Sequence, residues 1–278
     1  MDYGAYYFSG EPDFSIGKAK RADVKFVSDS HYHDTYEIYY LVSGTRRQFV
    51  NHTIYDMKKG DLILIPKGSI HKTTAIAENP HTRYLVNFSE SFSDGICKAL
   101  GESIGAVFET TIISVPESRR AYLLNLFEKM EEEYKTKGAD KYADAMIRNY
   151  LSELFVFILR RSDVKVPDDI PEKQIQSAAR FIYDNYDKDI TLAKAAKHVH
   201  MSESYFSKKF KAVTGLNFSE YIVSTRIKKA DELLINTNKS VSEIAELCGF
   251  SDANYFGDVF KKKKGLSPNK YRKSKSFR

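Results

Sequence analysis

One sequence pattern occurs twice in the last third of this 278-residue chain, and it constrains the fold more than any other feature. The pattern YFxxxFKxxxGLxxxxY covers residues 205–221 and recurs at residues 255–271, an offset of 50. Upstream, residues 191–202 resemble residues 240–251 at an offset of 49, so the second copy gains one residue near the start of its last helix. Such self-similarity is typical of one small structural unit used twice.

Each copy predicts two helices joined by a tight turn, at residues 191–212 and 240–262, with a connecting helix at about 219–236. Hydroxyl side chains stand where helix N-caps are needed, and the expected caps are Thr191, Ser202, Ser240 and Ser251. Ser240 and Glu243 also have the spacing of a capping box. Gly249 suits the turn of the second copy because glycine adopts positive φ freely.

The second helix of each copy predicts one buried face and one open face. Phe206 and Phe210, like Phe256 and Phe260, are four residues apart and must face the core. The open faces carry small, polar and basic side chains, as expected of helices that read the DNA major groove. The residues predicted to contact DNA are Ser204, Ser207, Lys208, Lys211, Ala253, Asn254, Asp258 and Lys261.

The predicted contacts divide by chemistry. The lysines are expected to bind phosphate and to provide affinity more than sequence choice. Asp258 has two interpretations: it accepts a hydrogen bond from cytosine N4, or it pairs with a nearby lysine away from DNA. A single helix pair could also belong to an ordinary helical bundle, but two basic copies favour a double helix-turn-helix domain.

The distribution of charge agrees with a polyanion partner for the C-terminal part only. Residues 172–278 contain 21 basic and 12 acidic residues, whereas the first 171 residues contain 22 and 25. The net charge of +6 therefore arises entirely in the C-terminal part.

Residues 172–272 resemble the DNA-binding domain of the AraC/XylS family of transcription regulators. The segments that carry the resemblance are 240–251, Asn254-Tyr255-Phe256, Phe260-Lys261 and 265–272. The resemblance implies a regulator that binds specific double-stranded DNA sequences through the exposed faces of its two recognition helices. Asp258 departs from the family, which often has a basic residue there.

Residues 1–115 read as β-strands and turns, and they contain a histidine-rich constellation. His31-x-His33-x3-Glu37 is followed by Gly60-x5-Pro66-x-Gly68-x2-His71. This spacing resembles the two motifs of the cupin fold, a small antiparallel β-barrel. Residues 31, 33 and 37 share parity, so a strand places them on one face.

The resemblance implies that this barrel senses a small molecule, commonly a sugar. The expected effector-binding residues are His31, His33, Glu37, Tyr39 and His71, with Tyr84 and Asn87 as weaker candidates. Two other interpretations stay open: His31, His33, Glu37 and His71 hold a divalent metal, or they are structural barrel residues. We expect no cofactor and no enzymatic activity; the alternative is a metal-dependent cupin enzyme fused to a DNA-binding module.

Two amphipathic helices are predicted at residues 117–137 and 141–161, within an element that spans 116–161. Their apolar stripes favour a role in homodimerisation, although packing on the barrel is the alternative. Residues 162–171 read as a linker to the DNA-binding domain at 172–278. The aromatic first fourteen residues predict either an arm over the barrel or a first strand.

The whole chain therefore predicts an α+β protein of two domains, an antiparallel β-barrel with two helices followed by an all-α double helix-turn-helix domain. No apolar run is long enough to cross a membrane, and no signal peptide is evident. Only two cysteines occur, Cys97 and Cys248, and they suggest neither a disulfide framework nor a zinc motif. We therefore expect a cytoplasmic protein.

Overall fold

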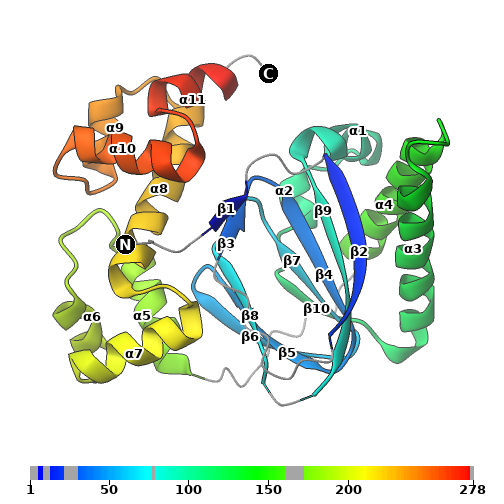
Figure 1. Cartoon of the computed structure of the whole chain (residues 1–278), viewed down its shortest axis with the longest axis horizontal. Helices are drawn as coiled ribbons and strands as arrows, with labels where there is room; N and C mark the ends of the chain where they lie inside the picture. The colour runs from blue at the N-terminus through cyan, green and yellow to red at the C-terminus, as the bar shows by residue number, and fades with distance from the viewer. Residues whose placement is uncertain (1–5, 9–12, 22–30, 77–78, 161–171, 276–278) are drawn as a thin grey trace.

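The computed structural model describes residues 6–8, 13–21, 31–76, 79–160 and 172–275. In these residues an N-terminal domain of two β-sheets and four helices precedes a C-terminal domain made only of helices (Figure 1). The predicted fold class is confirmed. The predicted linker at 162–171 lies outside the described residues.

The N-terminal domain contains two five-stranded sheets. The order in the first is β1 (Tyr6–Phe8), β3 (His31–His33), β8 (His71–Thr74), β5 (Thr45–Val50) and β6 (Thr53–Lys58). The order in the second is β10 (Ile112–Ser114), β7 (Asp61–Ile65), β4 (Tyr36–Ser43), β9 (His81–Phe88) and β2 (Phe14–Arg21). Neighbouring strands are antiparallel except β1 and β3, which are parallel.

The two sheets pack face to face. Tyr39, Leu41 and Ile63 of the second sheet share one buried cluster with Val50 and Met57 of the first. No strand of one sheet pairs with a strand of the other within the described residues, so the predicted barrel is two facing sheets without a closed ladder. We call the space between these sheets the domain interior.

The outer face of the second sheet is covered by α3 (Glu117–Thr136) and α4 (Ala143–Leu159) (Figure 1). The rings of Tyr40 and Tyr84 stack on Phe127 of α3 at centroid distances of 5.3 and 5.4 Å. The helices' buried residues include Leu123, Leu126, Phe127, Met130, Ile147, Leu151, Leu154, Phe155 and Ile158. The apolar stripes are therefore buried within the chain, as the alternative interpretation held, and they do not by themselves support dimerisation.

Two further helices in the N-terminal domain were not predicted: α1 (Glu90–Leu100) and α2 (Ile104–Val107). Helix α1 begins where the side chain of Ser89 accepts a hydrogen bond from the backbone N–H of Phe92, and it ends at Gly101 with φ of 68°. A serine cap before the helix and a glycine after it were readable signals.

The C-terminal domain consists of α5 (Lys173–Asp184), α6 (Leu192–His198), α7 (Glu203–Thr214), α8 (Phe218–Asn236), α9 (Val241–Leu247), α10 (Ala253–Lys264) and α11 (Pro268–Lys275). Each helix-turn-helix unit has its own core, one around Phe206 and Phe210 and one around Phe256 and Phe260. Helix α8 contributes residues to both cores and joins the units (Figure 1).

The predicted caps at Thr191, Ser202 and Ser240 are confirmed, and Ser240 forms a full capping box with Glu243. The cap predicted at Ser251 is wrong. Asp252 is the N-cap of α10, and its side chain accepts a hydrogen bond of 2.8 Å from the backbone N–H of Tyr255. The residue added in the second copy moves the start of α10 one position along the chain.

The two tight turns reach the same left-handed conformation with different residues. Gly249 has φ of 78°, as its role predicted, whereas His200 has φ of 56° at the matching place in the first unit. A β-carbon at position 249 would lie 2.7 Å from the backbone oxygen of Asp187. Glycine is therefore required in the second turn for space as well as for backbone conformation.

Residues 6–8 form strand β1, so the strand interpretation of the N-terminal aromatic segment applies to them; residues 1–5 and 9–12 lie outside the described residues. Cys97 and Cys248 are both buried and free. Within the described residues, no helix combines the length and hydropathy needed to cross a membrane.

Candidate effector site and DNA-binding surface

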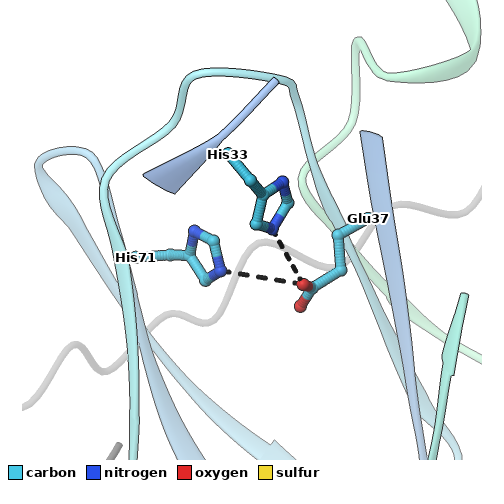
Figure 2. Close-up of side chains that lie close together, drawn as sticks. All are labelled: His33, Glu37 and His71. Atoms are coloured by element: carbon cyan, nitrogen blue, oxygen red, sulfur yellow. Dashed lines mark hydrogen bonds and ion pairs between the residues drawn. The ribbon is translucent and has the colours of Figure 1, made fainter. Parts of the chain in front are cut away.

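Three side chains from three strands converge in the domain interior (Figure 2). His33 on β3 and His71 on β8 both point at Glu37 on β4. Their Nε2 atoms lie 3.2 and 3.7 Å from the same Glu37 oxygen, Oε2. All three side chains are buried, with at most 5% of each residue exposed. We call His33, Glu37 and His71 the triad.

Backbone carbonyls fix the protonation pattern of both rings. Nδ1 of His33 lies 2.9 Å from the carbonyl oxygen of Thr35, and Nδ1 of His71 lies 2.8 Å from that of Ser69. A carbonyl oxygen only accepts, so each Nδ1 carries a hydrogen and donates it. Each neutral ring would therefore present the lone pair of Nε2 to Glu37.

The carboxylate of Glu37 stays ionised. Burial raises the pKa of this carboxyl, but the charge interaction with His71 and the hydrogen bond with His33 outweigh burial and hold the pKa well below its usual range. A carboxylate and two lone pairs that face one another need a cation between them. That cation is a proton shared as imidazolium or a metal ion.

The donor set fits both a polar ligand and a metal. One ligand atom from each of the three residues lies within 4.8 Å of the others. Two imidazoles and a carboxylate match the 2-His-1-carboxylate set that binds divalent metals with open positions, and each ring donates its second nitrogen to a carbonyl as metal-bound histidines do. The same groups can hydrogen-bond the hydroxyls of a bound molecule.

The other predicted effector residues divide between two locations. Tyr39 and Asn87 face the interior, and Asn87 is directly opposite Glu37 in the strand register. Tyr84 lies on the other face of the sheet, where its hydroxyl is 3.4 Å from Glu131, so it belongs to the helix-covered core. The backbone of His31 pairs with His71, but the His31 side chain lies outside the described part of the chain.

Three interior residues were missed from the sequence: Arg46 and Gln48 on β5 and Arg83 on β9. Arg46 and Gln48 are fully buried. Their alternation along β5 was a usable signal, but polar residues in a strand normally predict the solvent-facing side.

Most of the predicted DNA contacts lie on open faces of α7 and α10. The exposed ones are Ser204, Lys208, Lys211, Asn254, Asp258 and Lys261, while Ser207 and Ala253 are half-buried. Asp258 forms no ion pair with any described residue, so the interpretation that a lysine holds it away from DNA has no support. Tyr205 and Tyr255 were missed; they are 54% and 55% exposed at the start of their helices and recur as the first letter of the repeated pattern.

The first sheet of the N-terminal domain packs its outer face on the C-terminal domain. Tyr32, Phe49, Ile54 and Ile70 belong to the same buried cluster as the core of the first helix-turn-helix unit. The Nζ of Lys72 donates a 3.0 Å hydrogen bond to the carbonyl of Ala212 at the end of α7. This interface explains why apolar residues of β5 and β6 face away from the domain interior.

A buried ion pair joins the N-terminal domain to the second unit. Lys264, at the end of α10, has a side chain only 2% exposed. Its Nζ lies 3.2 Å from Asp34 and 2.6 Å from Asp231 of α8. Burial lowers the pKa of Lys264, but the two carboxylates outweigh burial and raise it above its ordinary value, so the ammonium is charged.

The site and the interface share two strands. On β3 and the turn after it, His33 faces the interior while Tyr32 and Asp34 contact the C-terminal domain. On β8 and just before it, His71 faces the interior while Ile70 and Lys72 contact that domain. Because side chains alternate along a strand, both histidines of the triad are flanked on each side by interface residues.

Both domains match known protein families. Residues 12–155 match the family described as AraC-like ligand binding domain, and residues 195–274 match a helix-turn-helix domain family. The chain is 25% identical over 245 residues to the Msm operon regulatory protein of Streptococcus mutans, covering 86% of this chain and 84% of that protein. It is 28% identical over 221 residues to the lactose operon transcription activator of Staphylococcus xylosus, covering 78% and 76%.

Among solved structures, the apo form of a single-substitution variant of ToxT from Vibrio cholerae aligns with 95% of this chain and 98% of its own, at 13% identity and a TM-score of 0.42. The ligand-domain match alone covers more than half of the chain, and the helix-turn-helix match covers both repeated units except the start of α6. The chain therefore belongs to the AraC family of transcription regulators, with a ligand-binding N-terminal domain and a DNA-binding helix-turn-helix domain.

Proposed function

We propose that this regulator responds to a carbohydrate that binds in the domain interior against the triad. The convergence of His33, Glu37 and His71 carries the proposal, because buried polar groups placed together on three strands orient a polar ligand. The names of several relatives support the ligand class. They include the lactose operon activator and the raffinose operon regulatory protein RafR of Pediococcus pentosaceus, which is 24% identical over 254 residues.

The shared strands offer a physical route from ligand to DNA. A ligand that moves His33 or His71 also moves the neighbouring residues of β3 and β8 that contact both helix-turn-helix units. The protein would then have two conformations that differ in the interface between its domains. The ligand shifts the equilibrium between these conformations according to its difference in affinity for them.

The test is a ligand screen on the full-length protein with two variants. His71→Gln should abolish the rise in melting temperature that a bound sugar produces, while DNA binding without sugar persists. Thr53→Ser, a mild change outside the triad, should respond like the wild type. If no sugar raises the melting temperature of the wild type at millimolar concentration, the carbohydrate proposal is refuted.

Dimerisation and location complete the proposal. We propose a homodimer that acts on DNA in the cytoplasm, as the family resemblance implies. The buried stripes of α3 and α4 leave their solvent-facing sides as the surface for a second copy, and Tyr122 there is 44% exposed. Light scattering at micromolar concentration should give twice the 31.9 kDa chain mass; a monomer at that concentration would refute this part.

A divalent metal in the triad is the second candidate, and the orientation of both rings favours it. If a metal binds, His33, Glu37 and His71 would hold it, and it would supply a Lewis acid that can bind ligand oxygens. Metal analysis of protein purified without chelator distinguishes the two. A tightly bound, stoichiometric metal that His33→Ala removes would favour this candidate and would reopen the enzyme alternative, which the regulators among the relatives otherwise disfavour.

A further inference from the structure

A second group of polar residues lies in the domain interior, away from the triad. In the register of β4 and β9, Glu37 is opposite Asn87 while Leu41 is opposite Arg83. In that of β5 and β8, Val50 is opposite His71, and Arg46 is four residues along β5. Four residues of extended strand span roughly 13 Å. Both arginines therefore lie at the end of the interior opposite the triad.

Arg46 is a buried cation with no anionic partner in the part of the chain that the structure describes. It is fully buried, and its Nη atoms donate to the carbonyls of Thr45 and Asn79 and to a ring nitrogen of His81, all neutral groups. Among the described residues no carboxylate forms an ion pair with it. The buried carboxylate of Asp61 interacts instead with Lys58 and Arg120. A buried charge is costly unless it is paired, and the described residues leave Arg46 available to an anionic ligand.

A second cation reinforces the first. The Arg83 guanidinium carbon lies 5.1 Å from the ring centroid of Tyr39, which is itself fully buried. Burial lowers the pKa of Arg46, Tyr39 raises it, and the like charge of Arg83 lowers it further. The two guanidiniums therefore create a positive potential that no described side chain neutralises.

Between the triad and the arginines, and at the arginines themselves, four buried hydrogen-bond donors have no acceptor among the described residues. Buried and without a partner are the Tyr39 hydroxyl, Nε of Arg46, Nε2 of Gln48 and Nε of Arg83. The amide of Gln48 is oriented, because its oxygen accepts a 3.0 Å hydrogen bond from the Thr73 hydroxyl. Three of these groups can only donate, so the group that satisfies them must be rich in acceptors.

We propose that Tyr39, Arg46, Gln48 and Arg83 form an anion subsite, which binds a carboxylate or phosphate group of the effector. The inference rests on the proposed carbohydrate function and narrows it: the ligand is a sugar acid or a sugar phosphate, with hydroxyls at the triad and its charged group at the arginines. Carboxylate and phosphate oxygens accept several hydrogen bonds and neutralise the guanidiniums, whereas a neutral hydroxyl brings a donor of its own and no charge.

The first experiment compares matched ligands on the full-length protein by thermal melting and titration calorimetry. The pairs are glucose with glucose 6-phosphate and glucuronate, and galactose with galactose 6-phosphate and galacturonate. We expect a charged member to bind at least tenfold more tightly than its neutral parent, with an affinity that falls as salt rises. A neutral parent that binds as tightly as its charged counterparts overturns the anion subsite and leaves the carbohydrate proposal intact.

Variants test whether the two arginines cause the tighter binding of charged sugars. Arg83→Gln is the main one, because Arg83 is half-buried and its loss should leave the fold intact; Arg46→Gln is the second. Each should weaken binding of the charged ligand at least tenfold. Lys20→Gln removes one positive charge from an exposed position of β2 and should leave the affinity unchanged. Equal loss in Lys20→Gln and Arg83→Gln would show a general charge effect and refute the subsite.

An additional arm separates failure of this inference from failure of the proposed function. If no sugar of either kind binds, the carbohydrate proposal fails, and inorganic phosphate then probes the subsite alone. Phosphate should raise the melting temperature more than chloride at equal ionic strength, and Arg83→Gln should remove part of that rise. Lys208→Ala, on the DNA-binding surface, should keep the part of the rise in melting temperature that Arg83→Gln removes. An identical response of the wild type and Arg83→Gln overturns the anion subsite.

Discussion

The ion pair between Asp34 and Lys264 provides a direct test of how the two domains are joined. At 3.2 Å, an effective dielectric constant of 20 gives a gross attraction of about 5 kcal/mol. Removal of both groups from water offsets much of this attraction, and Asp34 remains 32% exposed. We therefore expect a net coupling of about 1–3 kcal/mol, against about 0–1 kcal/mol for an ordinary surface pair.

A double-mutant cycle measures this coupling. Asp34→Ala, Lys264→Met and the double variant are unfolded with urea and followed by circular dichroism, since the chain has no tryptophan. The cycle cancels the separate ion pair between Lys264 and Asp231, because Lys264→Met removes that pair whether residue 34 is Asp or Ala. A parallel cycle of Asp34 with the exposed Lys261 should give no coupling.

The outcome bears on the mechanism as well as on stability. Asp34→Ala should also reduce the effect of a bound ligand on DNA affinity, because Asp34 follows His33 directly. A coupling below about 0.5 kcal/mol at low salt would mean that the domains do not hold this contact in solution, and the route through β3 would have to be abandoned.

Three further predictions concern the C-terminal domain and its contacts. Lys208→Ala should weaken DNA binding similarly for all sequences and reduce the slope of log affinity against log salt by about 1; an unchanged slope would remove Lys208 from the phosphate contacts. Gly249→Ala should destabilise the second unit by about 2 kcal/mol or more in thermal unfolding, because the alanine would have positive φ and its β-carbon would clash with the backbone of Asp187. His200→Gly, at the matching turn of the first unit, should change stability by about 1 kcal/mol at most. Burial lowers the pKa of Lys228 to about 8. Between this pKa and the ordinary pKa of lysine, the unfolded chain binds more protons than the folded chain, so a rise in pH favours folding. The free energy of unfolding of the wild type, relative to that of Lys228→Met, should therefore rise from pH 7 to 9.5. A difference in stability between the wild type and Lys228→Met that stays constant from pH 7 to 9.5 would contradict the lowered pKa of Lys228.

The helix-turn-helix units could be predicted because their signals are local. Caps, turn glycines and apolar spacing act within a few residues, so the repeated pattern is sufficient to define both helix pairs. The error at Ser251 shows the limit of this approach. Ser251 and Asp252 are both good caps, and the structure shows that the side chain of Asp252 accepts the hydrogen bond from the backbone N–H of Tyr255.

The triad was predictable for a similar reason, whereas the anion subsite was not. His33, Glu37 and His71 stand at a recognisable spacing. The expectation that one strand places His33 and Glu37 on the same face was wrong, because they lie on β3 and β4 of the two facing sheets. Strand β5, in contrast, reverses the usual pattern: its polar residues Arg46 and Gln48 are buried in the interior, while the apolar Phe49 faces the C-terminal domain. A sequence cannot show which face of a strand is outermost when a second domain covers it.

The alternation along the two sheets has a consequence for the evolution and engineering of this regulator. Among the described residues, interior positions such as Tyr39, Gln48 and Arg83 form no hydrogen bond or ion pair with the C-terminal domain, whereas Asp34 and Lys72 do. Under the proposed function, ligand preference and output would therefore be encoded in separate sets of positions, the first on β4, β5 and β9 and the second on β8 and just after β3. A library randomised only at interior positions should yield variants that answer to new ligands while the original operators and the coupling between the domains are kept.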